Sequence, residues 1–300
     1  MTILVTGATG HVGRLVTARL RDAGADVRAL TRDPAAAAAV LPAGVGTAVG
    51  DLADPDSLRP ALRGVERMYL FPFPGTAREV AALAARSGVR HVVVLSSGAV
   101  TAGFDTDFHL PVERAVAESG MAWTFVRPGE FMLNKLWLWG PSIRSARVVH
   151  EPFPEVPWYP VHEADIADVA AEALLTDRHT GAAHTLNGPE LLTREEQVAA
   201  IAAALGEDIE LVRVTPAEAR ERYLAQGGFA ADNADFLLGF TDYSGQAADP
   251  AEGPAEGPAA DPAEAQEPAP AAKVPTAADA TGRPARTFAD WARDHAADFT

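Results

Sequence analysis

A glycine-rich turn near the amino terminus restricts the fold of this chain more than any other feature. Residues 3–6 form a short apolar run that predicts a β-strand, and Gly7, Gly10 and Gly13 follow it at intervals of three. Apolar residues then recur at helical spacing up to Gly24. Glycines let such a turn reverse tightly and let a diphosphate approach the backbone, while the free amides that open the helix attract the anion. We therefore expect a dinucleotide-binding unit here rather than a purely structural turn.

The same strand-and-helix pattern repeats along the first half of the chain. Further strands are predicted at residues 26–31, 45–49, 67–71, 91–96 and 121–127. The run of β-branched residues in the fifth strand is typical of a strand that is buried on both faces. Because helical stretches separate the strands, the sequence predicts an α/β fold, a doubly wound parallel sheet of the Rossmann type, with a small α/β C-terminal lobe.

Changes in composition suggest where the parts of the chain begin and end. We expect residues 1–150 to form the dinucleotide-binding domain and residues 151–245 to form the smaller substrate lobe. Residues 246–284 are rich in Ala, Pro and acidic residues and have too few apolar side chains to form a core, so they predict a disordered linker. Residues 285–300 predict a C-terminal amphipathic helix.

Local signals mark both ends of one helix in the lobe. Thr193 is followed three residues later by Glu196, the spacing of a capping box that starts a helix. Gly206 follows the last apolar residue and predicts the end of the same helix.

The overall charge narrows the classes of partner. The chain has 25 basic and 41 acidic residues, a formal net charge of −16, which disfavours nucleic acid and anionic membranes, although much of the negative charge lies in the predicted linker. The absence of cysteine excludes disulfides and thiolate catalysis and suits a cytoplasmic location. We expect no signal peptide and no membrane span. We also expect no metal site, because no His-Glu-x-x-His pattern occurs. Small molecules are the expected partners; the oligomeric state stays open.

The end of the second strand discriminates between two cofactors. NAD(H) sites have an acidic residue about 20 positions after the glycine turn, where it binds the ribose hydroxyls. Here Arg32 occupies that point, and a guanidinium pairs with a 2′-phosphate, so NADP(H) is favoured. NAD(H) stays possible because Asp33 follows and because Arg32 could be a solvated surface residue. The predicted cofactor-binding residues are Gly7, Thr9, Gly10, His11, Val12, Gly13, Arg32, Asp51, Leu52, Phe71 and Ser96.

Several motifs together resemble a known family. They are the glycine turn, Asp51-Leu52, Ser96-Ser97-Gly98, residues 119–134, residues 162–169 and residues 186–190. Over about residues 1–240 the chain is similar to the extended and atypical short-chain dehydrogenase/reductases, and most of all to their NmrA-like branch. The resemblance implies an NAD(P)H-binding reductase of quinone-reductase type, or a redox-sensing regulator without catalysis. A sugar-nucleotide epimerase or dehydratase is a third alternative.

The chain lacks the Tyr-x-x-x-Lys pair with which classical family enzymes protonate a carbonyl oxygen, since no tyrosine is followed four residues later by lysine. His109 stands about where the tyrosine would fall, and Glu113 stands in the lysine position. On a helix these two share a face, so Glu113 could orient the imidazole, or the two could form an ordinary surface pair. We predict His109, Ser97 and Glu113 as catalytic residues, although Ser96 and Ser97 could merely cap the strand end.

A weak proton donor restricts the substrate. Hydride transfer to an isolated ketone builds an alkoxide, whereas a quinone or another conjugated acceptor spreads the charge. The sequence therefore predicts an NADP(H)-dependent oxidoreductase that acts on a conjugated, aromatic or quinone-like small molecule. Aromatic residues, among them Phe104 and Phe108, follow the predicted strands and could line the substrate pocket or belong to the core. The predicted substrate-binding residues are Phe73, Phe131, Trp137 and Trp158.

Overall fold

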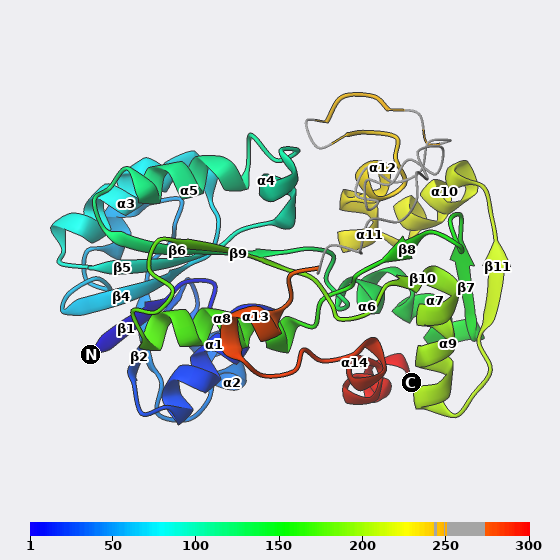
Figure 1. The fold of residues 1–300 in the computed structure, drawn as a ribbon, viewed down its shortest axis with the longest axis horizontal. Coiled ribbons are helices and arrows are strands. Elements are labelled where there is room, and N and C mark those ends of the chain that lie inside the picture. Colours follow the sequence, from blue (N-terminus) through cyan, green and yellow to red (C-terminus); the bar gives the residue numbers. More distant parts are fainter. Residues whose placement is uncertain (243–244, 249, 251–273) are drawn as a thin grey trace. The chain divides into compact units, whose positions relative to one another are not determined.

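Strands and helices alternate in the structure as predicted, and they build a seven-stranded sheet (Figure 1). The computed structural model describes residues 1–242, 245–248, 250 and 274–300. The strands of the sheet are β1 (Thr2–Val5), β2 (Asp26–Thr31), β3 (Gly46–Val49), β4 (Val65–Leu70), β5 (His91–Leu95), β6 (Ala122–Pro128) and β9 (Ala182–Leu186). Every neighbouring pair is parallel. The predicted doubly wound parallel sheet is confirmed.

The strand order is β3-β2-β1-β4-β5-β6-β9, so the direction of winding reverses between β1 and β4. In open parallel sheets ligands bind outside the carboxyl ends of the strands at such a reversal. The glycine turn follows β1, and Phe71 follows β4. The topology therefore brings these two segments to one edge of the sheet.

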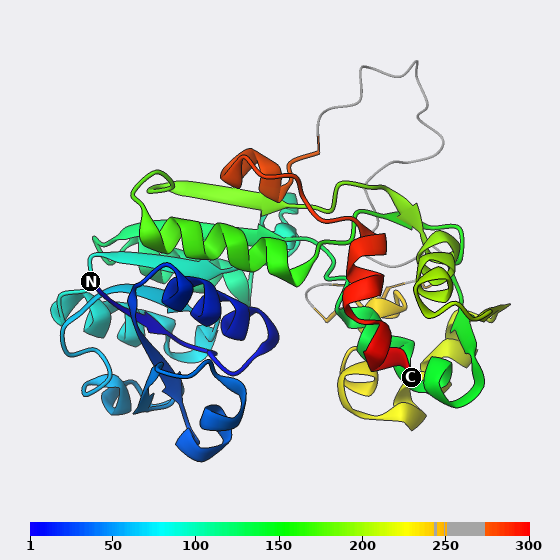
Figure 2. The ribbon, with the colours of Figure 1, turned by 90° about the horizontal axis from the view of Figure 1, so that it is seen from below.

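Helices cover both faces of this sheet. Its helical segments are α1 (His11–Asp22), α2 (Pro34–Val40), η1 (Pro55–Leu58), η2 (Pro74–Thr76), α3 (Ala77–Arg86), α4 (Gly98–Ala102), α5 (His109–Ala117), α8 (Glu163–Leu175) and α13 (Ala277–Thr281). Helices α3 and α5 lie on one face, and α1 and α8 lie side by side on the other (Figures 1 and 2). Strand β5 between them is buried along its whole length, as its β-branched sequence predicts.

The chain forms two compact units, and their boundaries differ from the predicted division at residue 150. The first unit consists of Met1–Gly129, Glu163–Leu186 and Pro275–Pro284; the remaining described residues form the second. The chain returns to the first unit because α8 covers the sheet and β9 joins it, a strand that the sequence prediction missed.

The predicted linker at residues 246–284 needs a similar correction. Residues 251–273 lie outside the described residues, so the prediction of disorder is untested there. Residues 275–284 belong to the first unit and contain α13, which packs against α8. This short helix forms because Thr276 and Asp279 make a capping box.

The second unit combines short strands with helices around its own core. Its elements are α6 (Asn134–Leu138), α7 (Gly140–Ala146), β7 (Val148–Glu151), β8 (Pro157–Trp158), β10 (Leu192–Thr193), α9 (Arg194–Leu205), β11 (Glu210–Arg213), α10 (Pro216–Gln226), α11 (Gly228–Asp232), α12 (Ala234–Leu237), α14 (Phe288–Asp294) and η4 (Ala296–Phe299). Phe288, Trp291 and Phe299 are buried in this core, as the predicted C-terminal amphipathic helix requires. None of the helices among the described residues has the length and apolar character needed to span a membrane.

Candidate active site

The turn after β1 can be built only with glycine at its key positions. The Gly10 amide donates to the Gly7 carbonyl oxygen at 3.0 Å, and Gly7 has a φ of 60°, in the left-handed region. A Cβ at Gly13 would lie 2.1 Å from the same Gly7 oxygen. The turn therefore brings the start of α1 against its own backbone and leaves no room for a side chain at Gly13.

The start of α1 is suited to an anion. Gly10 caps the helix without any side-chain hydrogen bond, and the first turn contains no acidic residue. The first amides of the helix and its positive dipole end are therefore not neutralised by a carboxylate of the first turn. Together with the glycine turn, this geometry fits the diphosphate of a dinucleotide.

A buried hydroxyl joins the ends of two neighbouring strands. Thr6 Oγ1 donates to the Tyr69 carbonyl oxygen at 3.0 Å and accepts from the Phe71 amide at 2.7 Å. A Cβ on Gly7 would lie 3.1 Å from Phe71 Cβ, which shows how closely the Phe71 side chain lies to the turn. Thr6, which the sequence analysis did not single out, thus holds an aromatic side chain beside the expected diphosphate site.

A cavity of about 620 Å³ opens at this edge of the first unit. This volume is in the range of small-molecule and cofactor sites. Among the predicted cofactor-binding residues, those that line the cavity are Gly7, Thr9, Gly10, Arg32, Asp51, Leu52 and Phe71, and Phe73 lines it with them. His11, Val12, Gly13 and Ser96 do not line it: the first three belong to the start of α1, and Ser96 is buried.

The two charged residues after β2, Arg32 and Asp33, have different contacts. Asp33 caps α2, because its Oδ1 accepts from the Ala35 and Ala36 amides at 2.9 and 3.1 Å. Arg32 is exposed, and no residue in the described ranges pairs with its guanidinium. Both side chains line the cavity; one carboxylate oxygen of Asp33 is engaged by the helix terminus, while the Arg32 guanidinium has no partner in the described part of the chain.

Asp105 holds the predicted catalytic histidine. His109 Nδ1 lies 2.5 Å from Asp105 Oδ2, and the Asp105 Oδ1 accepts from the Phe108 and His109 amides. Burial alone raises the pKa of the Asp105 carboxyl, but the hydrogen bonds from the His109 ring and from both amides outweigh burial and hold that pKa below its ordinary value. An ionised, buried carboxylate therefore faces an imidazole that keeps 20% of its side-chain surface exposed.

The predicted pairing of His109 with Glu113 is wrong. Glu113 is buried and accepts two hydrogen bonds from Arg127, at 2.8 and 2.6 Å, and one from the Ser96 hydroxyl at 2.5 Å. Although both residues lie on α5, Glu113 lies on its buried side, whereas Asp105, four residues before His109, holds the ring. Ser97 caps α4 by accepting from the Ala99 amide, which is the capping alternative for this serine.

The comparison with known protein families agrees with this geometry. The model of a family described as NAD(P)H-binding matches residues 7–177, more than half of the chain. The chain belongs to the NAD(P)H-binding family. The resemblance noted in the sequence, and the expectation of a nicotinamide dinucleotide as cofactor, are confirmed at this level.

Relatives of this NAD(P)H-binding protein are similar over its whole length. One is (4-alkanoyl-5-oxo-2,5-dihydrofuran-3-yl)methyl phosphate reductase of Streptomyces griseus subsp. griseus, 39% identical, and another is NAD(P)H azoreductase of Xenophilus azovorans, 34% identical; each alignment covers 99% of both chains. A solved NADPH-dependent quinone oxidoreductase from Escherichia coli shares the fold with a TM-score of 0.75 at 23% identity, over 97% of this chain and 99% of the other.

The predicted substrate-binding aromatic residues lie in both compact units of the protein. Phe73 lines the cofactor cavity and is exposed. Phe131, Trp137 and Trp158 belong to the second unit. Trp158 is buried, with the Arg194 guanidinium 4.7 Å from its ring centroid, so it takes part in packing within that unit. A role for these three side chains in substrate binding stays a prediction.

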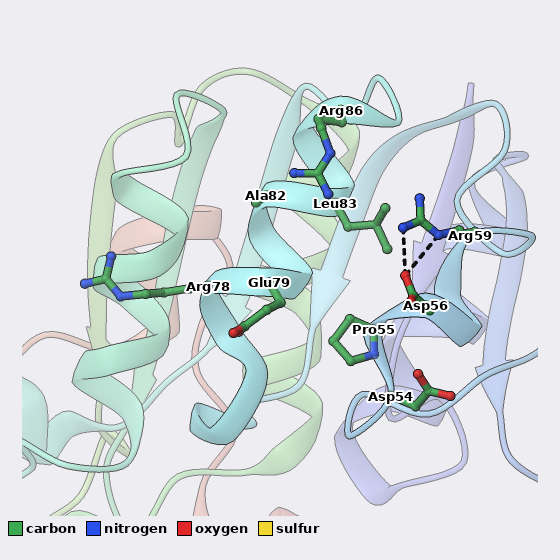
Figure 3. A pocket seen from close by; sticks show the side chains of 9 residues that line it. All are labelled: Asp54, Pro55, Asp56, Arg59, Arg78, Glu79, Ala82, Leu83 and Arg86. Carbon is green, nitrogen blue, oxygen red and sulfur yellow. Dashed lines mark hydrogen bonds and ion pairs between the residues drawn. The ribbon is translucent and has the colours of Figure 1, made fainter.

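A second cavity on the first unit contains none of the predicted site residues (Figure 3). It measures about 540 Å³ and is lined by both acidic and basic side chains from η1 and α3. Arg59 pairs with Asp56 inside it, and Arg78 pairs with Glu118. Two of its arginines thus already have acidic partners, and the cavity lies away from the glycine turn.

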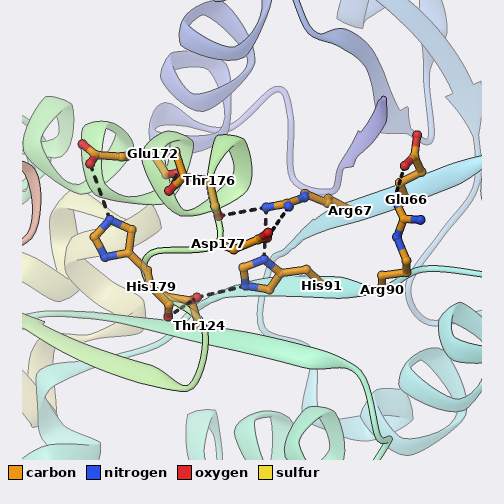
Figure 4. A network of polar contacts seen from close by, with 9 residues as sticks. All are labelled: Glu66, Arg67, Arg90, His91, Thr124, Glu172, Thr176, Asp177 and His179. Atoms are coloured by element: carbon orange, nitrogen blue, oxygen red, sulfur yellow. Dashed lines mark hydrogen bonds and ion pairs between the residues drawn. The ribbon is translucent and has the colours of Figure 1, made fainter.

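A histidine network lies at the opposite, amino-terminal edge of the same sheet (Figure 4). His91 Nε2 lies 3.0 Å from Thr124 Oγ1, and Arg67 pairs with Asp177 in the turn after α8. Burial, followed by the nearby Arg67 charge, lowers the pKa of His91 to about 4. No cluster among the described residues has the donors to hold a metal ion. This network holds the turn between α8 and β9 against β4 and β6.

Proposed function

We propose that this chain is an NADPH-dependent reductase of electron-poor, conjugated small molecules such as quinones, azo compounds and unsaturated carbonyl compounds. The buried Asp105 carboxylate against the His109 imidazole carries the proposal, because it provides a proton donor at the edge of the sheet where the cofactor cavity lies. The names of the relatives support it, since an oxo-dihydrofuran, an azo compound and a quinone are all conjugated acceptors.

The preference for NADPH is supported by charge. Arg32 lines the cavity without a partner in the described part of the chain, and a guanidinium binds a phosphate with two parallel hydrogen bonds. Asp33 also lines the cavity, but its Oδ1 is used to cap α2 and is not available to ribose hydroxyls. Phe71 and Phe73 supply the apolar wall of the same cavity, on which a planar ring can lie.

The proposed reduction has two parts, a hydride transfer from the cofactor and a proton transfer from the protein. When bound, NAD(P)H supplies a hydride from its nicotinamide ring. The glycine turn and the α1 amides would hold the diphosphate and so orient the ring end of the cofactor. His109 in its imidazolium form gives one proton to the acceptor, so that hydride and proton together complete a two-electron reduction. The imidazole regains its proton from water, to which it is partly exposed.

Asp105 makes a histidine sufficient where a tyrosine–lysine pair is missing. Its ionised carboxylate lies within hydrogen-bond distance of the ring nitrogen and fixes the orientation of the ring. Since a conjugated acceptor spreads the negative charge that builds up during hydride transfer, a donor of moderate strength meets the requirement.

Loss of the nicotinamide absorbance on mixing with a quinone, an azo dye and an enone tests the proposal. We expect turnover by the wild type, and a fall in kcat of roughly 100-fold in His109→Gln without a change in NADPH affinity. His150→Gln, which alters a histidine of the second unit, is the matched control and keeps full activity. A protein that binds NADPH yet leaves every acceptor untouched contradicts the proposal and supports a nucleotide sensor.

Asp105→Asn tests the positioning role separately. The variant keeps the size of the side chain but removes the negative charge, so the His109 ring loses the carboxylate that holds it. We expect kcat to fall while the Kd of NADPH is unchanged, and we expect no further fall when Asp105→Asn is combined with His109→Gln. A full additional fall in the double variant would mean that Asp105 only stabilises the loop.

A further inference from the structure

Two phenylalanines beside the His109 pair are exposed to an unusual degree. Phe104 and Phe108 keep 47% and 48% of their surface exposed, whereas Asp105 between them is buried. Large exposed aromatic side chains close to a polar functional group are typical of binding surfaces. The two rings are therefore candidates for contact with a ligand.

The loop that carries these rings is held by its own backbone. The Phe104 and Asp105 amides both donate to the Ala99 carbonyl oxygen, at 2.9 and 3.3 Å. At the other end, the Phe108 and His109 amides donate to the Asp105 carboxylate. Because hydrogen bonds fix the loop on both sides, the exposed rings are presented by a rigid backbone, which lowers the entropy lost when a ligand binds.

One of the rings touches the proposed proton donor. The Phe108 and His109 ring centroids are 4.9 Å apart with an interplanar angle of 72°, an edge-to-face contact. The loop connects α4 to α5 and follows β5, the neighbour of β4, so it lies at the same edge of the sheet as Phe71. A planar molecule in contact with Phe108 would thus lie beside the imidazole.

We propose that Phe104 and Phe108 are specificity-determining residues that select planar aromatic acceptors and bring them to His109. The proposal rests on the proposed function, and it adds a preference, among the acceptors, for molecules that bear fused or conjugated aromatic rings. Asp105 has two tasks in this arrangement: one carboxylate oxygen orients the donor, and the other fixes the loop that carries the aromatic surface.

The test compares an aromatic acceptor with a non-aromatic one in the same variants. We expect Phe104→Ala/Phe108→Ala to raise KM for 2-methyl-1,4-naphthoquinone roughly tenfold, while kcat/KM for cyclohex-2-enone and the Kd of NADPH stay within about twofold. Phe108→Leu, which keeps the apolar volume, separates stacking from simple burial and gives a smaller rise. Leu224→Ala, at a residue that is 46% exposed on α10, is the control and changes the KM of neither acceptor.

Three outcomes overturn the proposal: equal loss with both acceptors, no loss with either, or a change in sedimentation that shows the rings covering a second copy of the chain. Equilibrium dialysis of the naphthoquinone against the same variants keeps the two proposals distinguishable. If the wild type binds the quinone through Phe104 and Phe108 but reduces no acceptor, the aromatic surface stands and the reductase function fails.

Discussion

Replacing Arg32 by alanine tests the assignment of the cofactor most directly. The guanidinium is exposed and uncompensated among the described residues, so the variant removes one positive charge from the cavity without leaving a buried partner. A hydrogen bond to a charged group contributes about 1.5–3 kcal/mol, and each 1.4 kcal/mol is a factor of ten. We therefore expect NADPH to bind roughly 10- to 100-fold more weakly, and NADH to be affected less than about twofold.

Titration calorimetry with NADPH, NADP⁺ and NADH at two salt concentrations measures this difference. Because the interaction is exposed, the loss for NADPH should shrink as salt rises. Arg59→Ala is the matched control, since this arginine lines the other cavity of the first unit and is paired with Asp56 (Figure 3). Equal losses for NADPH and NADH in Arg32→Ala would refute the assignment of the 2′-phosphate to this guanidinium.

Three further variants test the packing of the first unit. Gly13→Ala places a Cβ 2.1 Å from the Gly7 carbonyl oxygen and should lower the free energy of unfolding by about 3 kcal/mol, with loss of NADPH binding, whereas Gly46→Ala, whose nearest atom is 3.7 Å away, should change it by less than roughly 0.5 kcal/mol in denaturant unfolding. The pKa of His91 is lowered in the folded chain, so as the pH falls from 6.5 to about 4 the unfolded chain binds the proton first and the free energy of unfolding decreases. His91→Gln should reduce this pH dependence in denaturant unfolding. Glu113→Ala leaves Arg127 without its partner and should cost on the order of 3 kcal/mol in urea unfolding, and a smaller loss in the Glu113→Leu/Arg127→Leu pair would confirm the cause.

Local signals in the sequence were sufficient for six of the seven strands of the sheet and for several helix ends. The run at β5 predicted a strand buried on both faces, and Thr193, Glu196 and Gly206 form the predicted capping box and helix end. These features depend on residues within a few positions of each other. Strand β9 was missed, because its sequence of small and polar residues has no apolar run, and only pairing with β6 makes it a strand.

The candidate site shows where local reasoning is insufficient. Spacing on a helix correctly placed His109 and Glu113 on one helix, but it could not show that Arg127, on β6, neutralises Glu113. Asp105 was missed although it stands four residues before His109, because the signal lies in the loop that precedes the helix. Only the fold decides which of two carboxylates at equal spacing reaches the imidazole.

Two polar networks at opposite edges of one sheet show why geometry must be combined with charge. At the amino-terminal edge, burial and then the nearby Arg67 charge lower the pKa of His91 to about 4 (Figure 4). The His91 imidazole is therefore neutral near pH 7 and has no proton to donate. At the carboxyl-terminal edge, His109 faces an ionised carboxylate and is partly exposed. Both histidines are hydrogen-bonded, but His91 is buried whereas His109 is partly exposed, so His109 is the one that we propose as the proton donor. The location of ligands at the carboxyl edges of parallel sheets favours the same choice.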